Sequence, residues 1–341
     1  MNKKRRLGRV IWTACLICLL GMICGACGVF DKEVVQEIET EDEDLIVVGF
    51  SQLGSESMWR TGNTASIQNA LSKENGFFLQ FNNARQKQEN QIKAIRSFIS
   101  QRVDYIVFAP VTEDGWDTVL TEAKEAGIPV ILVDLEISGM DAHLYTTRVG
   151  TDPYWEGKQA AIWLEQELEE AGQSEEEINI VILQGTPGAS VQIGRTSGFM
   201  EIANVHSNWK ILDQKPADFT TAKGKEVMEQ YLQKLEDIDV LFSQNDDMTF
   251  GAVEALREAG VYVGEGDDIR ILSIDGGRDA LQLVKNGIID VDVECNPEQG
   301  EMLAEVIRKL ENGEQVEKEY IVEDCVFTKD NVEEYIDSRT Y

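Results

Sequence analysis

The stretch that decides the fold is LIVVGFSQLGSESMWR, residues 45–60, because it passes from a buried strand through a polar loop into a helix. Its first part, Leu45–Phe50, is an apolar run rich in β-branched residues, which is typical of a strand buried on both faces. The loop Ser51–Ser57 carries hydroxyl, amide and carboxylate groups, and Trp59 and Arg60 open a helical pattern. We interpret the loop as one that faces a polar ligand.

The same unit of strand, loop and helix recurs along the chain. Apolar runs alternate with helical patterns, which predicts parallel sheets covered by helices on both faces. The runs form two series within the 297 residues after Asp44, enough for two domains of ordinary size. The expected fold class is therefore α/β, with two doubly wound parallel-sheet lobes. After the first, the predicted strands are 77–81, 105–109, 130–133, 144–149, 178–183, 210–212, 240–242, 269–274 and 289–293.

The N-terminus has the pattern of an export signal. Residues 1–26 begin with a basic head, continue with an apolar stretch and end in small residues. The sequence Ile23-Cys24-Gly25-Ala26-Cys27 resembles the bacterial lipobox, although Cys24 stands where that motif usually has leucine. We predict a lipoprotein signal peptide over 1–26 and a lipid on Cys27 that anchors the chain outside the cytoplasm, on the bacterial cell membrane. Ordinary cleavage and an uncleaved membrane helix are the alternatives.

Charge excludes one class of partner. After residue 26, 26 Lys and Arg face 62 Asp and Glu, a formal charge of −36. Such a chain repels phosphates, so nucleic acid is not an expected partner. Within the segment 27–44, the stretch Asp31–Asp44 holds eight acids and one lysine. This composition buries no core and repels itself, and we interpret 27–44 as an extended acidic tether.

Cysteines and histidines give little sign of a metal or cofactor. Of six cysteines, only Cys295 and Cys325 lie outside the export segment, and the spacing of these two matches neither CxxC nor a zinc motif. These two could pair in an exported chain or remain as free buried thiols. His143 and His206 stand in no ligand cluster. We therefore expect no metal and no cofactor.

Polar side chains follow most predicted strands, at the sheet edge where ligands bind in parallel sheets. Carboxylates and amides exchange directional hydrogen bonds with hydroxyl groups, and aromatic faces pack on sugar C–H groups. This composition favours a neutral polyol ligand. Residues 245–247 are equally good helix caps, and capping is the simpler reading for two of the three. The polar segments are 51–56, 109–110, 134–136, 184–190, 245–247, 275–277 and Glu294, with Trp59, Arg60 and Arg195 at helix starts.

Several motifs, in order along the chain, carry a resemblance to a known family. They are GFSQLGSESMWR (49–60), QKQENQIKAIRSFI (86–99), LQGTPGASVQIGRTSGF (183–199), ADFTTAKGKEVME (217–229), QNDDMTFGA (244–252) and SIDG (273–276). Together they resemble the type I, or ribose-type, periplasmic sugar-binding proteins of bacterial ABC importers, and among these the galactofuranose-binding members. The resemblance runs from Leu45 to Phe327. It implies the periplasmic binding protein-like I fold, a monosaccharide ligand, permease subunits of an ABC transporter as partners, no enzymatic activity, and a monomer.

The resemblance also implies a set of ligand contacts. Where relatives carry arginine after the aspartate of the fourth strand, this chain has Leu135, so a cation that holds sugar hydroxyls is missing. Glu136 is a candidate to fill part of that gap, and galactofuranose itself is put in doubt while the sugar class stands, so another pentose or hexose remains open. Carried over by position, the contacts are Ser55, Glu56, Trp59, Arg60, Asp134, Arg195, Asp218, Phe219, Asn245, Asp275 and Glu294.

In this family the chain crosses between the lobes three times. The resemblance places the crossings of this three-segment hinge near Val149–Thr151, Glu294–Asn296 and Ile321–Cys325. The first lobe then comprises 45–150 with 296–322, and the second comprises 151–295 with 323–341. Cys295 and Cys325 both fall on hinge segments, which makes a hinge disulfide a specific hypothesis. The implied mechanism is closure of the two lobes on the sugar.

Three other classes of function compete with this interpretation. An enzyme on such sheets is disfavoured because GxSxG, GxxxxGK[ST] and a GxGxxG after the first strand are all missing, although a paired-carboxylate glycosidase stays open. A sugar-responsive repressor would have a DNA-binding segment where this chain has an export signal. A sensor subunit that reports sugar to a membrane receptor or kinase is not separable from an importer subunit by sequence.

Overall fold

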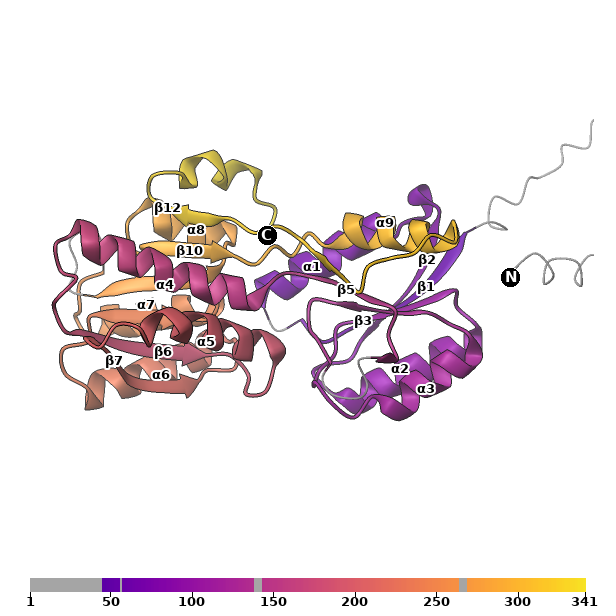
Figure 1. Ribbon diagram of the computed structural model, residues 1–341, viewed down its shortest axis with the longest axis horizontal. Coiled ribbons are helices and arrows are strands. Elements are labelled where there is room, and N and C mark those ends of the chain that lie inside the picture. Colours follow the sequence, from indigo (N-terminus) through magenta and orange to yellow (C-terminus); the bar gives the residue numbers. More distant parts are fainter. Residues whose placement is uncertain (1–44, 56, 138–142, 264–268) are drawn as a thin grey trace, which may run out of the picture. The chain divides into compact units, whose positions relative to one another are not determined.

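The computed structural model describes residues 45–55, 57–137, 143–263 and 269–341 (Figure 1). The export signal, the lipidation candidate Cys27, the acidic tether and the ligand candidate Glu56 lie outside these ranges. Over the described ranges, no helix combines the length and the apolar character needed to cross a bilayer.

The first sheet has six strands in the order β11-β5-β4-β3-β1-β2, and each neighbouring pair is parallel. One face packs on α1 (Met58–Ala70) and α9 (Gly300–Glu311), and the other on α2 (Gln88–Gln101) and α3 (Asp117–Ala126). The buried strands alternate their side chains between these two apolar clusters. The strands are β1 (Ile46–Gln52), β2 (Phe77–Asn83), β3 (Tyr105–Phe108), β4 (Val130–Val133), β5 (Thr147–Gly150) and β11 (Glu319–Ile321).

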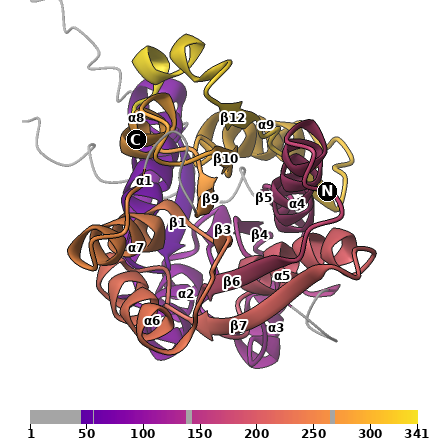
Figure 2. The same ribbon diagram turned by 90° about the vertical axis from the view of Figure 1, so that its left-hand side faces the viewer.

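The second sheet also has six strands, in the order β12-β10-β9-β8-β6-β7. In this sheet β12 runs antiparallel to β10, and the other neighbouring pairs are parallel. Figure 2 shows α6, α7 and α8 on one face and α4 and α5 on the other, matching two apolar clusters. The strands are β6 (Ile178–Gln184), β7 (Trp209–Pro216), β8 (Val240–Ser243), β9 (Arg270–Asp275), β10 (Val291–Glu294) and β12 (Val326–Thr328). The helices are α4 (Pro153–Glu170), α5 (Ser190–Ala203), α6 (Thr221–Lys234), α7 (Asp246–Glu258) and α8 (Arg278–Lys285). Short 3₁₀ turns are η2 (Lys73–Asn75), η4 (Val332–Glu334) and η5 (Ile336–Ser338).

The prediction of two doubly wound α/β lobes is thus confirmed. Three elements, β11, β12 and α9, are not among those that the sequence predicts, and others differ at their ends. The helical pattern of residues 157–170 predicts a helix that starts at residue 157, whereas α4 begins at Pro153, because Asp152 Oδ1 accepts the backbone N–H groups of Tyr154 and Trp155, both at 3.0 Å. The strand predicted at 144–149 pairs only from Thr147. β7 is longer than the predicted strand 210–212. Polar residues alternate along this edge strand, so its sequence contains no long apolar run.

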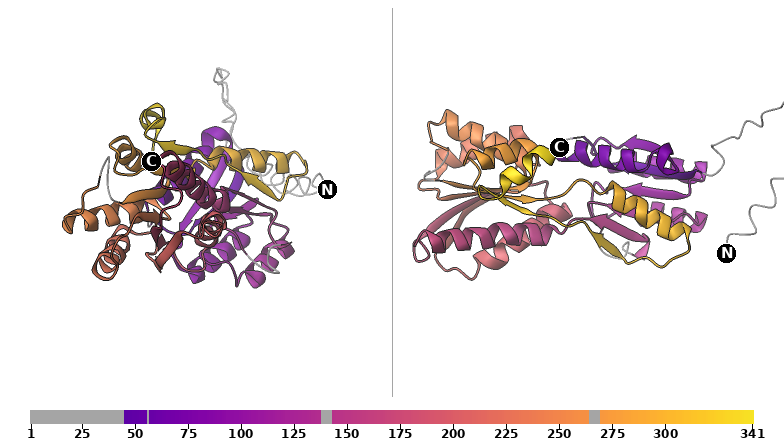
Figure 3. Two further views of the ribbon diagram at one scale, coloured as in Figure 1. Left: turned by 60° about the vertical axis from the view of Figure 1, so that its left-hand side comes forward. Right: turned by 90° about the horizontal axis from the view of Figure 1, so that it is seen from above.

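Three segments connect the sheets (Figure 3). After β5 the chain passes to α4, which packs on the second sheet. After β10 it returns to α9, which packs on α1, and after β11 it passes to β12. This order supports the proposed lobe boundaries, 45–150 with 296–322 and 151–295 with 323–341.

Candidate ligand site between the two sheets

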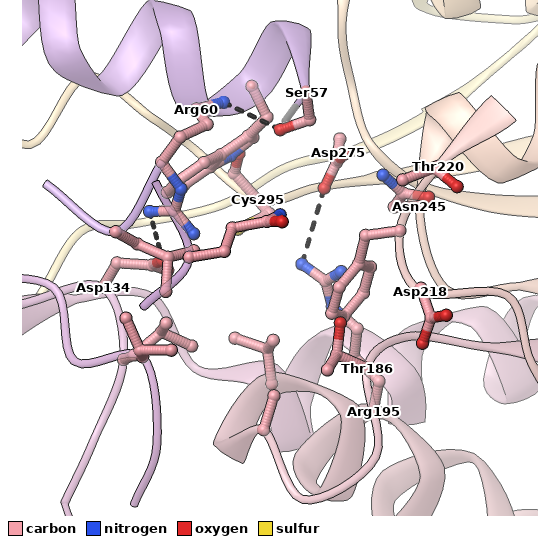
Figure 4. A pocket seen from close by; sticks show the side chains of 18 residues that line it. Ser57, Arg60, Asp134, Thr186, Arg195, Asp218, Thr220, Asn245, Asp275 and Cys295 are labelled. Atoms are coloured by element: carbon pink, nitrogen blue, oxygen red, sulfur yellow. Dashed lines mark hydrogen bonds and ion pairs between the residues drawn. The ribbon is translucent and has the colours of Figure 1, made fainter. Parts of the chain in front are cut away.

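A pocket of about 440 Å³ lies where the carboxyl ends of the two sets of parallel strands meet (Figure 4). Its volume falls within the range usual for small-molecule sites. The first lobe contributes Leu53, Ser57, Trp59, Arg60, Gln86, Val111, Asp134 and Leu135 to its lining. The second contributes Thr186, Ala189, Val191, Arg195, Asp218, Phe219, Thr220, Asn245 and Asp275, and Cys295 lies on a connecting segment.

On the first-lobe side, a buried ion pair is held at the start of α1. Arg60 Nη1 lies 2.7 Å from Asp134 Oδ2, and the Arg60 guanidinium lies 4.7 Å from the centre of the Trp59 ring. Ser57 caps the helix by accepting the Arg60 N–H at 3.0 Å, which fixes where α1 begins. Trp59 Nε1 donates to the backbone carbonyl of Cys295. The cap and this bond together aim a cation and an aromatic ring into the pocket.

On the second-lobe side, Arg195 is held by several acceptors at once. Its Nε donates to Glu156 Oε2 at 2.7 Å, one Nη donates to the Gln244 carbonyl, and the other lies 3.5 Å from Asp275 Oδ1. α4 and α5 approach closely here: a Cβ on Gly157 would lie 2.0 Å from the Arg195 carbonyl oxygen. Glycine at 157 therefore allows the backbone contact that brings Glu156 to the guanidinium.

Burial and charge act in opposite directions on this group. Burial lowers the pKa of Arg195, but Glu156 and the neighbouring acidic groups raise it by more, so the net shift is upward and the guanidinium stays charged. Burial raises the pKa of Asp275 well above its ordinary value, and Arg195 opposes that rise. The pocket thus holds the fixed cation of Arg195 beside the buried carboxyl group of Asp275. A ligand that forms a hydrogen bond with this carboxyl group would offset the cost of burying it.

Asn245 combines the two roles considered for it. Its Oδ1 caps α7 by accepting the Met248 N–H at 3.0 Å, and its side chain also lines the pocket. Asp246 is structural: its carboxylate accepts from Ser273 Oγ at 2.7 Å and from the Gly277 N–H at 2.9 Å.

Backbone strain is concentrated at this pocket. Eight non-glycine residues in the described ranges have positive φ, and five of these line the pocket. Such angles are uncommon outside glycine and tend to gather at functional sites. Gly185 makes room for one of them, because a Cβ there would lie 1.8 Å from Phe219 Cζ. The five are Gln86 (+57°), Asp134 (+63°), Asp218 (+53°), Phe219 (+57°) and Asp275 (+138°).

The structure brings most of the expected contacts together. Ser55 is exposed and does not line the pocket, whereas Ser57, two residues later, does. Glu294 is buried outside the pocket lining, where its carboxylate binds Arg339, the Tyr341 hydroxyl at 3.1 Å and the Cys325 N–H at 3.0 Å. The expected residues that do line the pocket are Trp59, Arg60, Asp134, Arg195, Asp218, Phe219, Asn245 and Asp275.

The expectation that Glu136 fills part of the gap beside Leu135 is not met. Its half-exposed carboxylate lies 3.4 Å from Arg148, and its N–H donates to Ser190 Oγ at 3.1 Å. Glu136 is absent from the lining, while Leu135 itself faces the pocket. An apolar side chain therefore occupies the place where the family resemblance implies an arginine.

The disulfide hypothesis is also corrected, because both hinge cysteines are free thiols. The Glu294 N–H donates to the Cys325 carbonyl at 2.8 Å, so these two residues face each other across β10 and the segment leading into β12. Cys295, one residue further along, then points to the opposite face. Its Sγ lies 3.4 Å from Thr151 Oγ1, and burial raises its pKa well above the ordinary value.

Sequence reasoning missed part of the lining. Gln86 and Thr220 lie in the quoted family motifs, so the strand-end rule could have found them, and Thr186 falls in the polar segment 184–190 without having been named as a contact. The aliphatic members carry no polar signal. Among the described residues, no group of three or more His, Cys, Asp or Glu side chains is placed to hold a metal ion.

Comparison with known proteins gives consistent results. A family model described as periplasmic binding protein domain matches residues 48–315. The galactofuranose-binding protein YtfQ of Escherichia coli is 39% identical over 298 residues, covering 86% of this chain and 91% of that protein. A Mycobacterium smegmatis structure in complex with β-D-fucofuranose superposes with a TM-score of 0.82 at 42% identity, covering 87% and 95%. The arabinose ABC transporter binding component of Shewanella sp. ANA-3, bound to L-arabinofuranose, gives 0.80 at 40% identity, covering 86% and 95%.

Proposed function

This chain belongs to the periplasmic binding protein family, and we propose that it captures a monosaccharide in its furanose form outside the cytoplasm and delivers it to an ABC transporter. Relatives of about 40% identity are named for, or bound to, furanose sugars, which supports the ring form. The proposed act is binding, without chemistry on the sugar.

The convergence of charged pairs from both lobes on one pocket carries this proposal. Arg60 with Asp134 and Arg195 with Asp275 present donors and acceptors on opposite sides. A sugar hydroxyl both donates and accepts, so it matches such mixed pairs, and the Trp59 ring can pack on C–H groups. Because each lobe supplies one pair, closure of the hinge on the sugar would satisfy both at once.

A thermal-shift panel tests this function directly. Galactose, fucose, arabinose, ribose, xylose, fructose and glucose are each added to the purified full-length protein. A sugar present at about 100 times its Kd adds roughly 2.7 kcal/mol to the free energy of unfolding, which raises Tm by several degrees. The C1 signal of ¹³C-labelled bound sugar then reports the ring form. A panel without any shift would contradict the proposal.

We further propose that Cys27, which lies outside the described residues, carries the lipid anchor. Cys27→Ala is expected to move the protein from the membrane fraction to the soluble fraction, because a lipid chain supplies the membrane affinity in such proteins. Cys24→Ala, three residues earlier, is the matched control and should stay in the membrane fraction. Membrane retention of the Cys27→Ala protein, seen by immunoblot of the two fractions, would count against the anchor.

A further inference from the structure

One side of the pocket is aliphatic, and we call it the apolar corner: Val111, Leu135, Ala189 and Val191. Leu135 and Val111 follow the neighbouring strands β4 and β3. The hydrogen bond from the Glu136 N–H to Ser190 Oγ brings Leu135 beside the start of α5, where the other two lie. Leu135 and Val191 are buried, at 6% and 7% exposed, whereas Val111 and Ala189 are partly exposed.

The four side chains of the corner offer a hydroxyl group no hydrogen-bond partner. They have no polar atoms, and the nearby Glu136 N–H already donates to Ser190. A hydroxyl placed there would lose hydrogen bonds to water without replacement, whereas a methyl group would gain from burial. The corner therefore discriminates by chemistry as well as by size.

One ligand can contact the corner and the charged groups together. Asp134 and Leu135 are consecutive residues, and both line the pocket. The charged pairs from the two lobes suit the ring hydroxyls of a sugar. The part of a hexofuranose most distant from those hydroxyls is the end of its exocyclic chain, which leaves that end for the apolar corner.

We infer that this pocket prefers a 6-deoxyhexofuranose, whose exocyclic chain ends in a methyl group, over the corresponding hexofuranose that ends in a hydroxyl. The inference rests on the proposed function and specifies the ligand class of the same site. Leu135 and Val191 act as specificity-determining residues.

Calorimetric titration with two sugars that differ only at C6 tests the inference. D-fucose is 6-deoxy-D-galactose, so the pair isolates a single hydroxyl. The full-length protein is expected to bind D-fucose at least tenfold more tightly than D-galactose. In Leu135→Asn, which is close in shape but polar, and in Val191→Thr, this ratio should shrink severalfold because the hydroxyl gains a partner. Leu212→Asn, on the exposed face of β7, is the matched control and should keep the wild-type ratio.

The outcomes separate the two proposals. Galactose binding as tight as fucose binding in the wild type overturns the inference while the sugar-binding function stands. A ratio unchanged in both corner variants overturns the role of Leu135 and Val191. Absence of binding to either sugar, together with silence of the whole thermal-shift panel, overturns the proposed function and the inference with it.

Discussion

Replacing Arg195 with methionine is expected to destabilise the second lobe by about 3–5 kcal/mol and to abolish sugar binding. The guanidinium is the partner of Glu156, whose side chain has no solvent exposure. Removing one member of a buried pair leaves the other charge without compensation, which costs far more than an exposed pair is worth. Differential scanning calorimetry and sugar titration measure the two effects.

A second substitution separates charge from packing. In the double variant Arg195→Met with Glu156→Gln, the uncompensated charge is gone, and Thr151 Oγ1 can still donate to the side chain at position 156. Much of the lost stability should return, while sugar binding should remain lost because Arg195 lines the pocket. Equal stabilities of the single and double variants would show that the buried charge is not the cause.

Trp59→Ala is expected to lower the free energy of unfolding and to weaken sugar binding, both by a large amount. The side chain starts from α1 of the first lobe but packs in the apolar cluster of α4, α5 and the second sheet. Truncating a buried tryptophan typically costs about 3–5 kcal/mol, and here the loss would fall on the contact between the lobes. Tm should drop by several degrees, and sugar titration should show binding weakened at least a hundredfold.

Trp59→Phe is the matched control for this position. It keeps most of the aromatic surface but removes the N–H that donates to the Cys295 carbonyl. Its cost should be near that of one buried hydrogen bond, about 0.5–3 kcal/mol, with binding reduced but measurable. An alanine variant as stable and as tight in binding as the phenylalanine variant would exclude the interlobe role of the ring.

The sequence was informative where burial is complete. Parallel strands such as β3 and β4 are buried on both faces and read as unbroken apolar runs, so their limits were predicted to within a residue. β11 and β12 are short strands at sheet edges, and half-exposed residues there give no such run. The helix α9 was missed with them.

The residues of the site also divide into those that the sequence predicts and those that it does not. Charged residues after buried strands, such as Asp134 and Asp275, were found because the carboxyl ends of parallel strands define the site. Glu294 follows the same rule, but its carboxylate turns to Arg339 and Tyr341, partners that lie more than forty residues further along the chain. The apolar corner was out of reach, because aliphatic residues near strand ends look like ordinary core until the second lobe is placed beside them.

The three connections between the sheets also constrain the time at which the protein can fold. Neither sheet is complete without late residues: the first lacks β11 and the cover of α9, which supplies Leu303 and Ile307 to its core, and the second lacks β12. A ribosome releases these segments after nearly everything else in both lobes. Contacts this distant in sequence form slowly, so the nascent chain remains incompletely folded until its last tenth has emerged. That delay would suit the location proposed for this chain outside the cytoplasm, because a polypeptide that is still unfolded can be threaded through a membrane.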